Sequence, residues 1–128
     1  KISPHHFHSL LYYADLYVGE GITTASECAQ LGTPAVLINT LQPGYINEQV
    51  KKGLVFNFSR ADKALPLIQS LVENLNLKQQ FRQKSNAMMD ELIDCTSFLV
   101  WLVDNFPDSI HHISEKNAPH IKNLKTGF

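Results

Sequence analysis

The chain has 128 residues, 44% of them hydrophobic, so it is long enough to fold as one globular domain with a core of its own. Eleven Lys and Arg residues against twelve Asp and Glu residues leave a formal net charge of −1, which excludes the broad electrostatic attraction that most nucleic-acid-binding proteins use. The longest apolar run, residues 98–103, is far shorter than the roughly 20 residues of a membrane-spanning helix. We therefore expect neither a nucleic acid nor a membrane span.

The first forty residues are predicted to form a helix followed by a βαβ unit. After Pro4, which suits the first turn of a helix, apolar residues recur at helical spacing to residue 14. Residues 15–18 have the character of a strand that breaks at Gly19, and a second helix is expected over about 24–31, closed by Gly32. The apolar run 35–38 is typical of a strand buried on both faces of a parallel sheet. This order of elements predicts a βαβ unit.

The remaining chain predicts one more strand and then helices. Pro43-Gly44 signals a turn, residues 46–52 have the pattern of a short helix ending at Gly53, and residues 54–58 that of the third strand. From Ala61 onward the pattern is helical, with two expected apolar faces: Leu65, Ile68, Leu71, Val72 and Leu75, then Leu77, Phe81, Met88, Leu92 and Ile93. A further helix over about 96–105 stops before Pro107.

These elements predict an α/β fold, a partial Rossmann-like three-layer sandwich with a short parallel sheet of about three strands and a helical carboxyl-terminal region. We expect one domain over residues 1–106 and a flexible polar tail over 107–128. Cys28 and Cys95 fit no metal-ligand spacing, which suggests reduced thiols in a cytoplasmic protein. Because the sequence begins at Lys1 and enters a patterned helix at once, we expect a piece of a longer protein.

A glycine turn follows the first predicted strand, where open parallel sheets bind ligands. Gly19, Glu20 and Gly21 lie at the carboxyl end of that strand, and glycines let a backbone approach an anion closely. The helix that starts at Thr23 or Thr24 exposes unpaired N–H groups and a partial positive charge, which together suit the binding of a diphosphate. The turn therefore predicts a nucleotide site.

Side chains near this turn admit two interpretations. The hydroxyls of Thr23 and Thr24 can bind phosphate oxygens, and the Glu27 carboxylate can accept two hydrogen bonds from a ribose diol. The same residues, Thr24 to Glu27, also match a capping box, which needs no ligand. Glu20 opposes the ligand interpretation, because its charge would repel a diphosphate unless the side chain points away or binds a sugar hydroxyl.

The stretch LLYYADLYVGEGITTASECAQLGTPAVLI, residues 10–38, resembles the carboxyl-terminal nucleotide-sugar domain of GT-B glycosyltransferases and of UDP-N-acetylglucosamine 2-epimerases. It is most similar to the DUF354 family of GT-B-like proteins. The segment TSFLVWLVDNFP, residues 96–107, also resembles the closing helix of that family. The resemblance implies that the turn at 19–21 with Thr23 and Thr24 contacts a diphosphate, that Glu27 binds the ribose, and that Asn47, Glu48 and Gln49 lie where relatives place polar sugar or phosphate contacts.

The resemblance implies a UDP-linked nucleotide-sugar substrate and no other cofactor. It also implies a missing amino-terminal domain that carries the acceptor site and the catalytic base, so this piece alone is expected to be inactive. The sequence departs from the relatives in the turn, where Glu20 and Ile22 replace their Ser-Gly or Gly-Gly pattern. The alternative is a non-catalytic carbohydrate or nucleotide binding module, or a structural assembly unit of a surface-polysaccharide system.

Two further expectations concern surfaces and other polar residues. We expect self-association through an open sheet edge or through the apolar helix Phe98–Phe106. His5 and His8 would share a helix face without a nearby carboxylate, so we expect no metal site. Tyr12, Tyr13 and Trp101 could stack on a base or a sugar, but at helical spacing they are more often core residues.

Overall fold

The computed structural model of the protein describes residues 3–114. The chain divides into two compact units, Lys1–Met89 and Asp90–Phe128, which we describe separately. The first unit contains the sheet. In chain order the elements are η1 (Pro4–His6), α1 (Phe7–Tyr13), β1 (Tyr17–Gly19), α2 (Ile22–Leu31), β2 (Ala35–Ile38), α3 (Gly44–Lys51), β3 (Val55–Phe58), α4 (Ala61–Glu73), α5 (Leu77–Glu91), α6 (Cys95–Asp104) and α7 (Asp108–Ser114).

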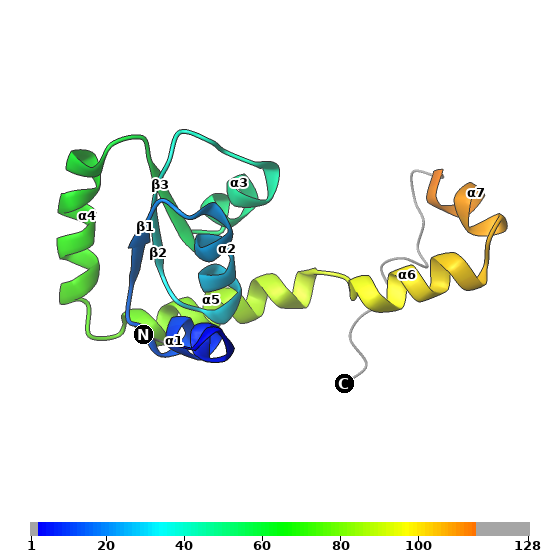
Figure 1. Ribbon diagram of the computed structural model, residues 1–128, viewed down its shortest axis with the longest axis horizontal. Coiled ribbons are helices and arrows are strands. Elements are labelled where there is room, and N and C mark those ends of the chain that lie inside the picture. The colour runs from blue at the N-terminus through cyan, green and yellow to red at the C-terminus, as the bar shows by residue number, and fades with distance from the viewer. Residues whose placement is uncertain (1–2, 115–128) are drawn as a thin grey trace. The chain divides into compact units, whose positions relative to one another are not determined.

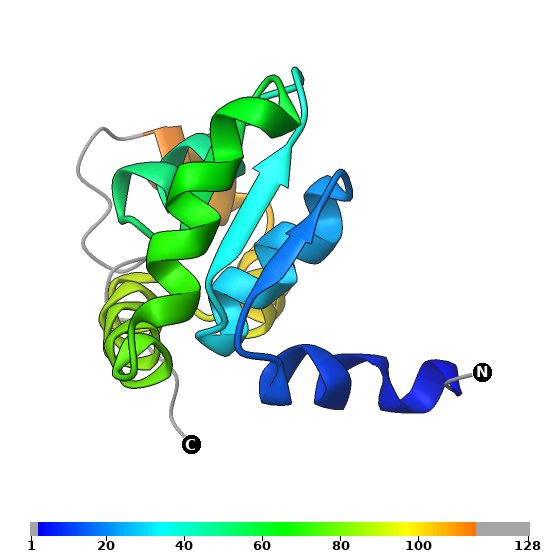
Figure 2. The ribbon, with the colours of Figure 1, turned by 90° about the vertical axis from the view of Figure 1, so that its left-hand side faces the viewer.

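The three strands form a parallel sheet in the order β1-β2-β3, which confirms the predicted α/β fold. Leu37 of the central strand lies opposite Gly19 on β1 and Asn57 on β3. Because both crossovers between neighbouring strands have the same hand, α2 and α3 cover one face of the sheet. α4 covers the other face, and β1 is an edge strand (Figures 1 and 2). The sheet is therefore the middle of three layers.

The amino-terminal ends of β2 and β3 lie against α5. Gly32 and Gly53 both have positive φ, 73° and 66°, as expected for residues that end a helix. A Cβ atom at Gly32 would lie 2.9 Å from the Cα atom of Arg82 in α5. Next to it, the Ser85 hydroxyl donates a hydrogen bond to the Gln30 carbonyl at 2.7 Å, and the Lys84 ammonium donates one to the Gly53 carbonyl at 3.3 Å. α5 is thus fixed to both loops that precede these strands.

The predicted apolar face of α4 is buried only in part. Ala64 and Leu71 belong to the core, and Ile68 packs against it from a half-buried position. Leu65, Val72 and Leu75, which the sequence placed on the same face, are exposed. The predicted apolar face is therefore wider than the surface of the sheet that it covers, and only part of it is buried.

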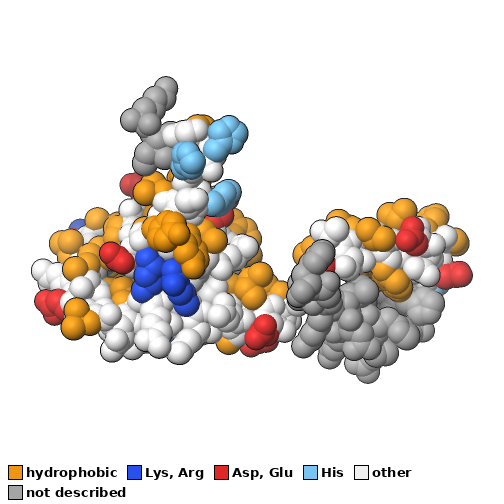
Figure 3. Space-filling view, turned by 90° about the horizontal axis from the view of Figure 1, so that it is seen from below, with side chains coloured by type: hydrophobic (Ala, Val, Ile, Leu, Met, Phe, Trp, Pro, Cys, Tyr) orange, Lys and Arg blue, Asp and Glu red, His pale blue; other side chains and the backbone are white. Residues whose placement is uncertain are grey.

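Two tyrosines at the end of α1 are also exposed rather than in the core. Tyr12 and Tyr13 pack edge to face, with ring centroids 5.1 Å apart, and the Arg82 guanidinium lies 4.5 Å from the centroid of the Tyr12 ring. Figure 3 views the molecule from the side of α1 and α5, where basic side chains lie beside apolar ones. The expected assignment of these tyrosines to the core is therefore wrong.

The second unit consists of two helices in its described part. Asp94 caps α6 by accepting hydrogen bonds from the backbone N–H groups of Thr96 and Ser97. The Ser109 hydroxyl of α7 donates to the Leu102 carbonyl at 2.8 Å. Residues 108–114 were expected to be a loose tail, and the structure corrects this because they form α7. The rest of the predicted tail, 115–128, lies outside the described residues.

Within the described residues, no helix combines the length and the apolar composition that spanning a bilayer requires. Cys28 and Cys95 are both free thiols, the first buried and the second exposed.

Candidate functional site

The glycine turn leads directly into α2, at the carboxyl end of β1. α2 begins at Ile22, two residues before the predicted start, and Gly21 is its N-cap. No side chain caps the helix, and Thr24 lies within its first turn. The capping-box interpretation of Thr24 and Glu27 is therefore wrong, because Thr24 is too far into the helix to serve as the N-cap residue.

The side chain of Tyr17 packs closely against both glycines of the turn. Its phenol ring folds over the turn, so that a Cβ atom at Gly19 would lie 2.5 Å from the Tyr17 hydroxyl oxygen, and one at Gly21 would lie 3.0 Å from it. The Gly21 N–H donates to that oxygen at 3.2 Å, and the hydroxyl can donate to the Gly21 carbonyl at 3.4 Å. A side chain at Gly19 would therefore require the Tyr17 ring to move away from the turn.

The amino end of α2 retains free hydrogen-bond donors. Four N–H groups at a helix start have no partner within the helix. Here the Gly21 N–H is bound by Tyr17, and Ala25 donates to the Gly21 carbonyl at 2.9 Å. In the described chain, no acceptor contacts the N–H groups of Ile22, Thr23 or Thr24. These three donors and the positive end of the helix dipole can together bind an anion.

The turn is held in place by the neighbouring strand end. Asn39 follows β2 directly, and its side-chain amide donates to the Glu20 carbonyl at 3.0 Å. Its Oδ1 atom accepts a hydrogen bond from the Leu41 N–H at 2.9 Å. The Glu20 side chain is exposed, whereas its backbone is fixed by this contact. Asn39 therefore links the carboxyl ends of β1 and β2.

Glu27 lies one turn further along α2 and faces α1. Its carboxylate is 3.5 Å from the His8 imidazole Nε2 atom, and about a third of the Glu27 side chain is exposed. The expectation that no carboxylate lies near His8 is wrong, because the packing of α1 on α2 brings the two together. The described residues contain no group of three or more His, Cys, Asp or Glu side chains that could hold a metal ion.

Cys28 follows Glu27 but is not a candidate nucleophile. Its side chain lies in the core, where burial raises the pKa of the thiol to about 11, with a smaller contribution from the Glu27 carboxylate. The thiolate, which is the reactive form, is therefore scarce near neutral pH.

The polar residues of α3 are placed differently from the turn residues. Gln49 is buried, and its amide nitrogen donates to the Ser26 hydroxyl of α2 at 2.9 Å. It joins α2 to α3, and its buried Oε1 atom has no hydrogen-bond partner among the described residues. Asn47 is half-buried and donates to the Gln42 carbonyl at 3.4 Å. Glu48 is exposed and pairs with Lys51 at 2.6 Å, which lowers the pKa of the Glu48 carboxyl.

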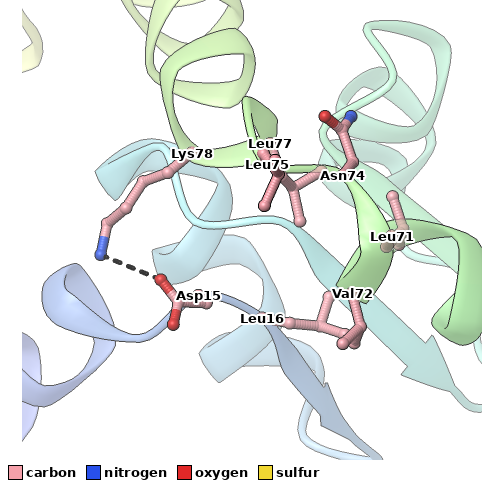
Figure 4. A pocket seen from close by; sticks show the side chains of 8 residues that line it. All are labelled: Asp15, Leu16, Leu71, Val72, Asn74, Leu75, Leu77 and Lys78. Atoms are coloured by element: carbon pink, nitrogen blue, oxygen red, sulfur yellow. Dashed lines mark ion pairs between the residues drawn. The ribbon is translucent and has the colours of Figure 1, made fainter.

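The cavity in Figure 4 lies at the opposite end of the sheet. Its volume is about 260 Å³, and it is formed between the loop that enters β1 and the α4–α5 connection. Four leucines and a valine line it, and Lys78 at its rim donates to the Tyr13 carbonyl at 2.7 Å and lies 3.7 Å from Asp15. Its place before β1 separates this cavity from the glycine turn, which follows β1.

Sequence reasoning found the turn but missed two residues that shape it. Tyr17 was assigned only to the strand, although its spacing two residues before Gly19 places both on the same face. Asn39 carried a usable signal, because a polar residue directly after a buried strand lies at the ligand-binding edge of a parallel sheet.

The start of α2 offers three backbone donors and the hydroxyls of Thr23 and Thr24, a set suited to hold an anion, while the Glu27 carboxylate lies further along the helix beside His8. Comparisons with protein-family models, with curated proteins and with solved structures each found no match to this chain.

Proposed function

We propose that the chain is the nucleotide-sugar-binding half of a glycosyltransferase or of a nucleotide-sugar epimerase. The diphosphate would bind at the amino end of α2, on the backbone from Gly21 to Thr24 and on the Thr23 hydroxyl. Glu27 would accept hydrogen bonds from the ribose. The acceptor site and the catalytic base would lie in an amino-terminal domain, so this chain alone would bind the nucleotide sugar without catalysing its reaction.

The observation that carries the proposal is the uncapped start of α2. Ser, Thr, Asp or Asn at an N-cap position supplies a side-chain acceptor for the first N–H groups of a helix, whereas glycine supplies none. Here the N-cap is a glycine, and three successive N–H groups have no acceptor in the described chain. They lie after β1, at the edge where open parallel sheets bind their ligands. Exposed Glu20 does not block them, because its backbone is fixed by Asn39 and its side chain is free to turn away or to reach a sugar hydroxyl.

The start of α2 would also assist the reaction catalysed by the whole protein. In glycosyl transfer and in epimerisation through a released nucleotide, negative charge develops on the leaving diphosphate. N–H groups that are already oriented stabilise such charge without reorganising. The turn would therefore contribute to catalysis as well as to binding.

The test is a titration of the full chain with UDP, followed by the backbone amide signals in NMR spectra and by calorimetry. GDP, CDP and ADP serve as comparison ligands. We expect saturable binding of UDP, with the largest shifts at the amides of residues 22–24. Glu27→Gln should weaken binding, whereas Glu73→Gln, at an exposed glutamate on α4, should leave it unchanged.

Two results would contradict the proposal. One is the absence of saturable binding for all four diphosphates at concentrations of several millimolar, where a free energy near −4 kcal/mol would still be detected. The other is binding whose shifts lie away from the start of α2.

A further inference from the structure

The cavity between the loop that enters β1 and the α4–α5 connection has an apolar part and a charged part. Its apolar wall is made of five aliphatic side chains, Leu16, Leu71, Val72, Leu75 and Leu77. The Lys78 ammonium and the Asp15 carboxylate lie together on the side of the cavity away from Leu71 and Val72 (Figure 4). The cavity therefore suits a ligand that is apolar at one end and charged at the other.

The apolar wall is covered only in part by the chain itself. Leu71 and Leu77 are buried in the core, whereas Val72 is 68% exposed and Leu75 is 99% exposed. An apolar cavity of about 150 Å³ is already large enough to hold benzene. At about 260 Å³, this cavity has room for a group of the size of a leucine or phenylalanine side chain, which would cover the two exposed residues.

The two charged groups of the cavity do not satisfy each other. The nearest Asp15 oxygen lies 3.7 Å from the Lys78 Nζ atom, which is too far for a hydrogen bond. Of the three donors of the ammonium, one binds the Tyr13 carbonyl at 2.7 Å, and the other two have no acceptor among the described residues. The Asp15 side chain is 93% exposed and has no second ion pair in the described chain. Both charges are therefore available to a ligand.

A ligand with a single charge would suit only one of these groups. A carboxylate that pairs with Lys78 would be repelled by Asp15, and an amine that pairs with Asp15 would be repelled by Lys78. A free α-amino acid carries a carboxylate and an ammonium on the same carbon, so it can pair with both groups at once. The residue at either end of a peptide carries only one of these charges, and it therefore fits less well than the free amino acid.

We propose that this cavity binds a free apolar α-amino acid, such as leucine or phenylalanine. Its carboxylate pairs with Lys78, its ammonium pairs with Asp15, and its side chain packs between Leu16 and the aliphatic residues of the α4–α5 connection. The proposal does not depend on nucleotide binding, because the cavity precedes β1 whereas the glycine turn follows it. Since the ligand is small and the charged groups face solvent, we expect a dissociation constant on the order of 1 mM.

A series of four ligands tests each part of the amino acid separately. L-Phenylalanine is compared with 3-phenylpropionate, which lacks the ammonium, with 2-phenylethylamine, which lacks the carboxylate, and with L-alanine, which lacks the apolar side chain. Each is titrated into the full chain to about 20 mM, well above the expected constant, and followed by backbone amide shifts in NMR spectra. We expect saturable shifts at Leu16, Val72 and Leu75 with L-phenylalanine. The two analogues with one charge should bind about threefold to tenfold more weakly, and L-alanine should not saturate.

Two variants should change the order of these affinities. Asp15→Asn should weaken the binding of L-phenylalanine but strengthen that of 3-phenylpropionate, because the lost carboxylate attracts the ammonium of the first and repels the carboxylate of the second. Lys78→Met, which keeps an unbranched apolar stem, should weaken both carboxylates and leave 2-phenylethylamine bound. Asp62→Asn is the control, because Asp62 is an exposed carboxylate on α4 that does not line the cavity, and it should change none of the affinities.

Four results would overturn the proposal. Without saturable shifts for L-phenylalanine, the cavity has no ligand of this class. Equal affinities for L-phenylalanine and its two analogues would mean that the cavity takes apolar groups whatever their charge. Weaker binding of both L-phenylalanine and 3-phenylpropionate to Asp15→Asn would mean that Asp15 maintains the structure and does not contact the ammonium. Shifts confined to residues 22–24 would place the ligand at the start of α2 and not in the cavity.

Discussion

Replacing Gly32 with alanine tests how closely α5 approaches the end of α2. Gly32 has a φ of 73°, and a left-handed residue other than glycine costs about 1–2 kcal/mol. The new Cβ atom would also lie 2.9 Å from the Arg82 Cα atom, so the backbone of α5 must shift. Overpacking of this kind typically costs about 1–3 kcal/mol. We expect Gly32→Ala to lower the free energy of unfolding by about 2–5 kcal/mol in total.

Gly53→Ala is the matched control, because Gly53 has nearly the same φ, 66°, but its added Cβ would meet only the flexible Lys84 ammonium at 3.3 Å. It should lose about 1–2 kcal/mol, the conformational cost alone. Gly44→Ala, where nothing lies within 4 Å and φ is not positive, should be neutral or slightly stabilising. Urea denaturation followed by circular dichroism measures all three. Equal losses for Gly32→Ala and Gly53→Ala would refute the role assigned to the α5 backbone.

Three further predictions concern single side chains. Thr33→Val should lower the free energy of unfolding by about 1–3 kcal/mol in urea denaturation, because the buried Thr33 hydroxyl donates to the Leu11 carbonyl at 2.7 Å, and Thr33→Ser should lose less. The free energy of unfolding should fall as pH rises from about 9 to 11, because the Cys28 thiol ionises near its ordinary pKa of 9.0 in the unfolded chain, whereas burial raises its pKa to about 11 in the folded protein. Cys28→Ala should lose less stability over this range, and equal pH profiles for the two proteins would contradict the prediction. Hydrogen bonds from Ser97 and Thr96 lower the pKa of Asp94, so the capping of α6 by its carboxylate should be complete above the ordinary carboxyl range and lost as pH falls through the lowered pKa. The NMR shifts of the Thr96 and Ser97 amides should follow this titration, and Asp94→Ala should abolish their pH dependence.

The sheet could be predicted from the sequence because local signals agreed. The apolar run of β2, the glycines that end α2 and α3, and the break after β1 each have a local physical cause, and together they specify parallel strands. The position of the glycine turn at the carboxyl-terminal edge of the sheet could be predicted from the same order of strands and helices.

The details of the turn could not be predicted, because they depend on packing between distant residues. Tyr17 covers Gly19 only once β1 is extended, and Asn39 reaches Glu20 only when β1 and β2 pair. Gln49 was expected near a ligand, but α3 packs on α2 and the amide is used inside the protein by Ser26. The exposed part of the α4 stripe was likewise undetectable, because periodicity gives the direction of an apolar face and not the extent of its cover.

The position of α5 affects how the protein is made on the ribosome. Its contacts join Arg82 to Gly32, Ser85 to Gln30 and Lys84 to Gly53, so residues 31 to 55 positions apart in the chain must meet. The strands and their covering helices emerge during synthesis well before these partners do. Until about residue 85 has left the exit tunnel, the amino-terminal ends of β2 and β3 stay uncovered in the nascent chain, and that interval is when it should be most open to chaperones and proteases.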